Sequence, residues 1–135
     1  ERGPASNDSR HRLSAALTLA LPWDIQASTV IAARSGLPYN VTTGADDNRD
    51  TQTNDRPAGV GRNASLGAPL FQADLRLTKG FTVRGVGIEL IAEAFNITNQ
   101  KNWTGYDGNQ RSPTFDKPTN GEITRQVQLG FRIDF

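Results

Sequence analysis

The segment from Asp46 to Asp50 carries the densest set of oxygen ligands in the chain. Side chains at every second position, Asp46, Asn48 and Asp50, have the spacing that suits a hard cation such as Ca²⁺, because calcium binds several carboxylate and amide oxygens. An EF-hand loop starting at Asp46 would need Gly at its sixth position and Glu at its twelfth, and this chain has neither. These departures favour a solvated polar loop, with a calcium site at Asp46, Asn48 and Asp50 as the weaker alternative.

Groups that could catalyse a reaction are sparse. Glu89 and Glu93 share one face of an extended segment and suggest a carboxylate pair that acts as acid and base. The chain has no Cys, its one histidine is His11, and no Ser stands at a recognisable triad spacing from that histidine. The glutamates are better explained as charges on a polar, water-facing side of a sheet. Asp74, Arg76, Arg132 and Asp134 are predicted to share this side. The sequence therefore predicts no enzyme activity and no cofactor.

Composition restricts the class of protein further. The 15 Lys and Arg residues nearly balance the 14 Asp and Glu residues, which argues against a general nucleic-acid partner. No apolar run reaches the roughly 18 residues of a membrane-spanning helix. Hydrophobic residues make up 36% of the chain, which is low for a water-soluble core, but barrel strands expose only every second residue to lipid. With no Met and no secretory signal, the chain is expected to be an internal piece of a longer protein.

Alternating apolar and polar residues define the elements that must position these side chains. Five strands are predicted near residues 10–21, 25–34, 71–79, 86–98 and 125–135. Short turns are expected at Pro22–Asp24 and within Gly80–Gly87, and long polar connections at 35–70 and 99–124. Residues 13–20 and 88–95 also fit a helical period, and the turn spacing favours strands there. The pattern predicts an all-β fold: an antiparallel up-and-down meander of about five strands, as the C-terminal part of a large transmembrane β-barrel.

The last strand ends on an aromatic residue. Gln128, Gly130, Ile133 and Phe135 follow an order of polar, glycine, hydrophobic and terminal aromatic residues. This order resembles the signal by which the assembly machinery of bacterial outer membranes recognises its barrel substrates. The final strand of a soluble sheet is the alternative interpretation.

Further stretches carry a resemblance that extends over nearly the whole chain. They are residues 8–13 (DSRHRL), 33–41 (ARSGLPYNV), 54–63 (NDRPAGVGRN), 74–79 (DLRLTK) and 93–99 (EAFNITN). In this order, they resemble the carboxy-terminal barrel of TonB-dependent receptors of the Oar-like subgroup, which carry a carboxypeptidase-regulatory-like domain. The resemblance implies a receptor in the bacterial outer membrane that imports a scarce ligand. Its implied partners are membrane lipid, the barrel-assembly machinery, the rest of its own barrel and plug, and TonB through an upstream segment.

Two aromatic residues of the second long connection, Trp103 and Tyr106, are candidates for a loop surface that holds the imported ligand. Aromatic residues also form belts at membrane interfaces, so that role is the alternative. A soluble β-sandwich that binds a ligand such as a carbohydrate through these rings remains the rival interpretation of the whole chain. An enzyme of a jelly-roll class is a weaker rival, because no constellation of residues supports it.

Overall fold

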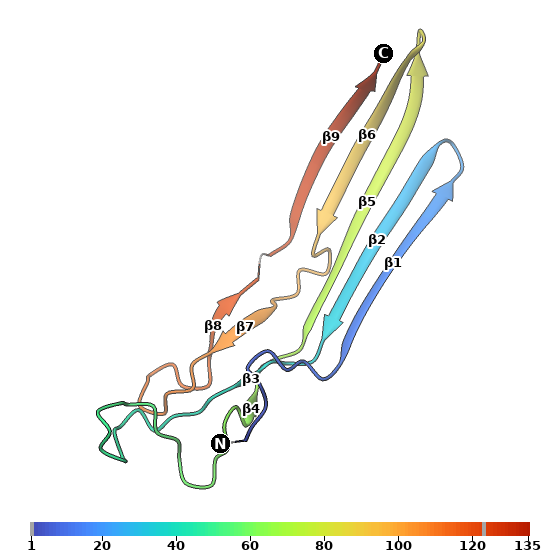
Figure 1. The fold of residues 1–135 in the computed structure, drawn as a ribbon. Coiled ribbons are helices and arrows are strands. Elements are labelled where there is room, and N and C mark those ends of the chain that lie inside the picture. Colours follow the sequence, from blue (N-terminus) through green and yellow to red (C-terminus); the bar gives the residue numbers. More distant parts are fainter. Residues whose placement is uncertain (1, 123) are drawn as a thin grey trace. The chain divides into compact units, whose positions relative to one another are not determined.

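The computed structural model describes residues 2–122 and 124–135, and the chain is all-β within them. Five long strands form one antiparallel sheet whose order, β1-β2-β5-β6-β9, keeps the order of these strands in the sequence (Figure 1). They are β1 (Arg12–Leu21), β2 (Ile25–Arg34), β5 (Leu70–Val83), β6 (Val86–Phe95) and β9 (Gln126–Asp134). The predicted up-and-down meander is therefore confirmed. The described residues contain no helix, so none that could cross a membrane, and residues 13–20 and 88–95 lie in strands.

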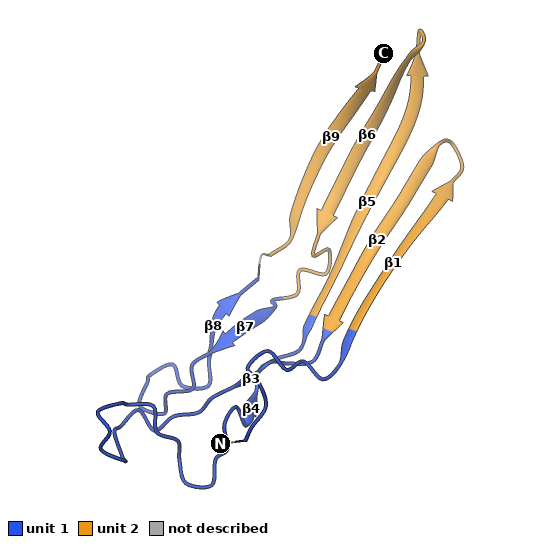
Figure 2. Cartoon of the chain, viewed as in Figure 1, with its two compact units in different colours: residues 1–12, 34–70, 101–122 blue, residues 13–33, 71–100, 123–135 orange. Residues whose placement is uncertain are grey.

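The chain divides into two compact units (Figure 2). The sheet unit comprises residues 13–33, 71–100 and 123–135, and the loop unit comprises residues 1–12, 34–70 and 101–122. The sheet unit holds most of the long strands. The loop unit holds most of the two long connections, of which residue 123 lies outside the described residues.

The loop unit contains short strands where the sequence indicated only polar connections. β3 (Pro38–Tyr39) pairs with β4 (Ser65–Leu66), and β7 (Trp103–Tyr106) pairs with β8 (Pro118–Gly121). Backbone hydrogen bonds join the two connections, because the Thr42 N–H donates to the Gly108 carbonyl at 2.8 Å and the Gln110 N–H donates to the Thr42 carbonyl at 3.0 Å. The connections thus form one body and not two separate loops.

The turn expected within Gly80–Gly87 is shorter than predicted. β5 continues through Gly80, which pairs with Glu89 in the ladder, and only Arg84 and Gly85 connect β5 to β6. Both residues have positive φ, 51° and 86°, as a two-residue hairpin of type I′ requires. Gly80 suggested a break in the sequence, but a glycine whose backbone groups stay in the ladder does not end a strand.

One face of the sheet is mainly apolar and the other is mainly polar. Leu77 pairs with Ala92 and Ala92 with Leu129, whereas Arg76 pairs with Glu93 and Glu93 with Gln128. Because side chains alternate across a strand, the first set lies on one face and the second set on the other. The apolar face carries Leu13, Leu17, Ile25, Ile31, Leu77, Phe81, Ile88, Leu90, Leu129 and Phe131. The polar face carries Thr18, Gln26, Ser28, Arg76, Thr78, Glu89, Glu93, Gln128, Arg132 and Asp134.

The apolar face is uncovered in this chain. Leu17 is 53% exposed, Phe131 is 72% exposed and Leu129 is 81% exposed. Among the described residues, the buried apolar side chains are only Val41, Leu70 and Ala73. The sheet is therefore held by its backbone ladder and by cross-strand pairs, without a dry core beneath it.

Candidate functional site

The loop unit brings both candidate aromatic residues to one pocket. Tyr106 of β7 stacks on Tyr39 of β3, with ring centroids 5.2 Å apart and an angle of 18° between the planes. These two rings and Trp103 line a pocket of about 350 Å³, which we call the aromatic pocket. Tyr39 was not among the residues that the sequence suggested, although it lies within the ARSGLPYNV stretch.

Hydrogen bonds and two glycines fix the rings of the aromatic pocket. The Ala68 N–H donates to the Tyr106 hydroxyl at 2.9 Å, and the Tyr39 hydroxyl donates to the Asp116 carboxylate. A Cβ atom on Gly67 would lie 2.5 Å from Cε2 of Tyr106, and a Cβ atom on Gly121 would lie 3.0 Å from Cε3 of Trp103. The absence of these Cβ atoms lets the rings lie directly against the backbone.

Electrostatics keep the aromatic pocket neutral. Burial raises the pKa of the Tyr39 hydroxyl, and its hydrogen bond to the Asp116 carboxylate raises this pKa further. Tyr39 therefore stays a neutral hydrogen-bond donor at physiological pH. None of the described residues that line the pocket carries a charged side chain.

Two asparagines supply amide groups to the same pocket. Asn63 is 6% exposed, and its Nδ2 donates to the Pro4 carbonyl at 2.8 Å. The Asn63 N–H donates to Oδ1 of Asn40 at 3.3 Å, which holds the two residues together. The pocket thus combines aromatic surfaces with fixed amide groups, an arrangement typical of sites for small polar molecules.

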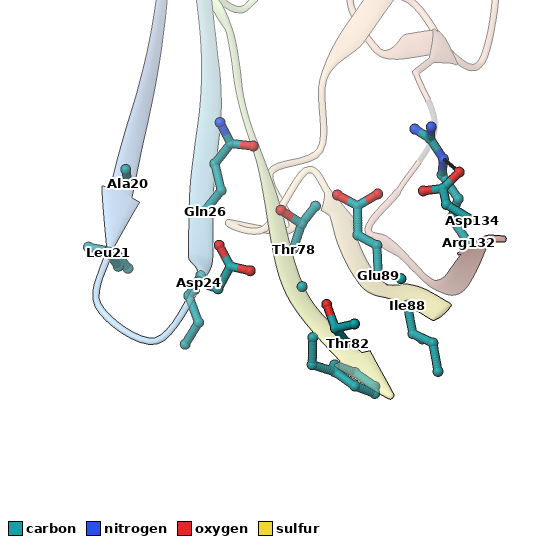
Figure 3. A pocket seen from close by; sticks show the side chains of 14 residues that line it. Ala20, Leu21, Asp24, Gln26, Thr78, Thr82, Ile88, Glu89, Arg132 and Asp134 are labelled. Carbon is teal, nitrogen blue, oxygen red and sulfur yellow. Dashed lines mark hydrogen bonds and ion pairs between the residues drawn. The ribbon is translucent and has the colours of Figure 1, made fainter. Parts of the chain in front are cut away.

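A second hollow lies on the polar face of the sheet unit. Figure 3 shows Gln26 of β2, Thr78 of β5 and Glu89 of β6 side by side at an open depression of about 540 Å³. Arg132 and Asp134 of β9 line it too, and Nε of Arg132 lies 3.2 Å from Oδ1 of Asp134 (Figure 3). This ion pair is largely exposed, so it adds little stability.

The suggested carboxylate pair has different partners on that face. Glu93 accepts from NH1 of Arg76 at 3.3 Å and from Nε2 of Gln128, whereas Glu89 pairs in register with Arg132. Each glutamate therefore faces a cationic or amide neighbour across the ladder. The polar face is a surface of balanced charges suited to water and polar solutes.

The side chains of the acidic segment, residues 46–50, accept hydrogen bonds from backbone N–H groups of the same loop. Oδ1 and Oδ2 of Asp46 accept from the N–H groups of Asp50 and Thr51, each at 2.9 Å. Oδ1 of Asn48 accepts from the Asp50 N–H at 2.9 Å, and Oδ1 of Asp50 accepts from the Gln52 N–H at 2.8 Å. No group of three or more His, Asp or Glu residues within the described ranges could hold a metal ion. These oxygens thus bond backbone N–H groups of the same loop, and the calcium site at Asp46, Asn48 and Asp50 stays an untested alternative.

Three of the four residues of the suggested assembly signal lie in β9, on both of its faces, and Phe135 follows the strand. Gln128 and Gly130 lie on the polar face, opposite Glu93 and Ile91. Ile133 lies on the apolar face opposite Ile88, and Phe135 is fully exposed. Their role in assembly stays a prediction.

Sequence reasoning missed the buried asparagine that closes the connection after β6. Asn96 is 2% exposed with φ of 50°, and its N–H donates to Oδ1 of Asp74 at 2.8 Å. Its side-chain amide also bonds both backbone groups of Gln100, at 2.9 and 3.1 Å. A usable signal was present, because Asn directly after a strand tolerates the left-handed backbone of a tight turn.

Comparisons of the chain with known family models, with curated proteins and with solved structures gave no significant match. A function has to be inferred from the residues and geometry of the chain itself.

Proposed function

We propose that the chain is part of a TonB-dependent receptor of the Oar-like kind in the bacterial outer membrane. In this proposal the sheet unit supplies membrane strands of the barrel, and the loop unit helps to capture the ligand that is imported. The uncovered apolar face of the sheet is the observation that carries the proposal. The five sequence stretches that resemble this family support it independently.

A sheet with one uncovered apolar face needs an apolar neighbour. Large exposed apolar patches on soluble proteins mark interfaces or aggregation sites, because water around them is costly. Exposed leucines occur on outer and inner strands alike, as Leu17 of β1, Leu77 of β5 and Leu90 of β6 are each at least 40% exposed. Lipid acyl chains would cover such a face on every strand at once, as they do in outer-membrane barrels.

The opposite face suits a water-filled lumen. Barrel strands of this class alternate lipid-facing apolar residues with polar residues that face the interior. The cross-strand contacts of Glu93 with Arg76 and Gln128 follow this pattern. Charged side chains on that face would meet water and passing solute, and their mechanistic role would be binding and gated passage without bond chemistry.

The stagger between neighbouring hairpins supports tilted strands. The Gly80 N–H donates to the Asp24 carbonyl at 3.0 Å, so the β1–β2 turn lies level with Gly80. The β5–β6 turn begins at Arg84, four residues beyond Gly80, which corresponds to roughly 13 Å along the strand. Figure 1 shows both turns at the end of the sheet where β9 ends. If both turns lie at the same depth in the membrane, this offset and a lateral distance of two strand spacings, each about 5 Å, correspond to strands tilted by roughly 50° from the membrane normal. Membrane strands are tilted by ~45°.

One cation on the apolar face, Lys79, has contacts that suit a residue at a membrane boundary. Lys79 pairs with Leu90 on this face, and its Nζ donates to the backbone carbonyl of Trp23 in the β1–β2 turn. Lys residues at such positions keep the stem in apolar surroundings and extend the ammonium toward the headgroups. Trp23 is 80% exposed, and Trp is common at the same depth.

Membrane fractionation of the full-length protein tests the proposal. We expect the protein to stay with washed membranes at high salt and alkaline pH and to leave them only in detergent. In detergent, a folded barrel should migrate differently on gels before and after boiling, because the closed sheet resists unfolding. Recovery of folded protein in buffer without detergent would refute the proposal and favour the soluble β-sandwich.

A further inference from the structure

We propose that the aromatic pocket of the loop unit binds a neutral saccharide. The inference rests on the proposed function in one respect: it names the class of ligand that the loop unit captures. Tyr39, Trp103 and Tyr106 would provide the stacking surfaces, and Asn40 and Asn63 the polar contacts.

The composition of the pocket matches the chemistry of a sugar ring. A sugar presents an apolar face of C–H groups, which packs on the electron-rich face of an aromatic ring. Its edge carries hydroxyl groups that both donate and accept hydrogen bonds. The Asn40 amide can donate through Nδ2, because its Oδ1 is the atom that holds the Asn63 N–H. The Tyr106 hydroxyl accepts from the Ala68 N–H and keeps its own hydrogen to donate.

The absence of cationic side chains among the described lining residues argues against anionic ligands. No described lining residue is charged, and the nearby Asp116 carboxylate already accepts from the Tyr39 hydroxyl. A carboxylate-bearing ligand would lose its hydration in this pocket without gaining a counter-charge, and the nearby Asp116 carboxylate would repel it. The pocket thus disfavours anions and suits polar molecules without a negative charge.

The pocket is formed before any ligand arrives. β3 and β7 hold Tyr39 and Tyr106 in contact, and the backbone at Gly67 and Gly121 supports the rings. A ligand therefore does not have to order these side chains, which lowers the entropic cost of binding. At about 350 Å³ the pocket is at the small end of the range for small-molecule sites, so one or two sugar rings would fill it.

Tryptophan fluorescence of the full-length protein tests the inference, because the part of the signal that Trp103→Phe removes belongs to Trp103. The difference in emission between the unmodified protein and Trp103→Phe is titrated with glucose, maltose and N-acetylglucosamine, with citrate as the anionic comparison. We expect saturable binding of at least one sugar and none of citrate. Binding of citrate with equal affinity, or no response to any of the three sugars from folded protein, would overturn the inference.

Matched variants locate the binding by calorimetry. Trp103→Ala should weaken the best sugar by tenfold or more, Trp103→Phe should restore most of the affinity, and Trp23→Ala should leave it unchanged. Equal affinity in Trp103→Ala and Trp23→Ala would place the sugar elsewhere and refute the pocket. Circular dichroism checks that each variant is folded.

Failure of this inference differs from failure of the proposed function. A protein that needs detergent for extraction but binds none of the sugars leaves the receptor proposal in place and removes the saccharide pocket. A protein that binds sugar but dissolves in buffer without detergent removes the receptor proposal and leaves the saccharide pocket in place.

Discussion

Buried asparagine side chains organise the connections of this protein. Asn63, Asn96 and Asn102 are each at most 6% exposed, which is unusual for a polar residue outside a core. Asn63 and Asn96 also have positive φ, 52° and 50°. An asparagine can hold such a backbone and bond neighbouring peptide groups at the same time, so one residue fixes both the turn and the segment next to it.

Replacement of Asn96 tests this role. We expect Asn96→Ala to lower the free energy of unfolding by about 2–4 kcal/mol, because it leaves the backbone groups of Gln100 without their partner and removes the short polar side chain that lets Asn tolerate a left-handed backbone. Asn96→Gly should cost less, since glycine accepts that backbone. Gln100→Ala is the control, because the contacts with Asn96 use only its backbone. Chemical unfolding in detergent gives the values, and equal stability of Asn96→Ala and Gln100→Ala would contradict the prediction.

Tyr39 links the aromatic pocket to pH. Its pKa is raised above the usual value of about 10, chiefly by burial and then by Asp116, so the folded state favours the neutral hydroxyl. The resulting stabilisation is fully present below pH ~10 and is lost as the pH rises through the raised pKa of folded Tyr39.

Titration of phenolate absorbance in the full-length protein checks this pH dependence, because comparison with Tyr39→Phe identifies the transition of Tyr39. The transition that disappears in Tyr39→Phe should lie above the pH at which free tyrosine ionises. Tyr39→Phe should also abolish the corresponding loss of stability at high pH. If the transition that Tyr39→Phe removes lies at or below the pH at which free tyrosine ionises, the Tyr39 hydroxyl is not buried and hydrogen-bonded as described.

In the strands of the sheet unit, the polarity of the side chains alternates between the two faces. In β1, Leu17 lies on the apolar face, and the even-numbered residues share the face on which Thr18 contacts Ser28 at 3.2 Å. Neighbouring residues of one strand are therefore expected to respond in opposite ways to the same added charge.

A pair of variants in β1 measures that difference. Leu17→Arg should reduce the fraction of full-length protein recovered folded from membranes, because an Arg at the bilayer midplane costs about 2–4 kcal/mol. Ala16→Arg, one residue earlier, should have little effect since its side chain would reach the aqueous lumen. The readout is the folded band on unboiled gels of detergent extracts. Similar losses for both variants would show that the faces of β1 do not meet lipid and water as proposed.

Considered whole, the molecule stabilises its two units by different means. The sheet unit relies on ladder hydrogen bonds and cross-strand pairs, and its outer strands, β1 and β9, have one edge without a strand partner among the described residues. Unpaired edges are costly in lipid and prone to aggregation in water, so the proposed barrel would close them with further strands. The loop unit relies on side chains that bond backbone groups, as Asp46, Asn63 and Asp107 do.

The alternation of residues determined the five strands, their up-and-down order and the character of each face, because the pleat of a strand sends successive side chains to opposite sides whatever surrounds them. Tertiary structure alone decided that Gly80 stays in the ladder and that Tyr39 meets Tyr106 and Asp116. These contacts join residues far apart in the chain, and nothing in the local pattern around either partner specifies the other. The fold was therefore readable from local periodicity, whereas the aromatic pocket appeared only when the two long connections came together.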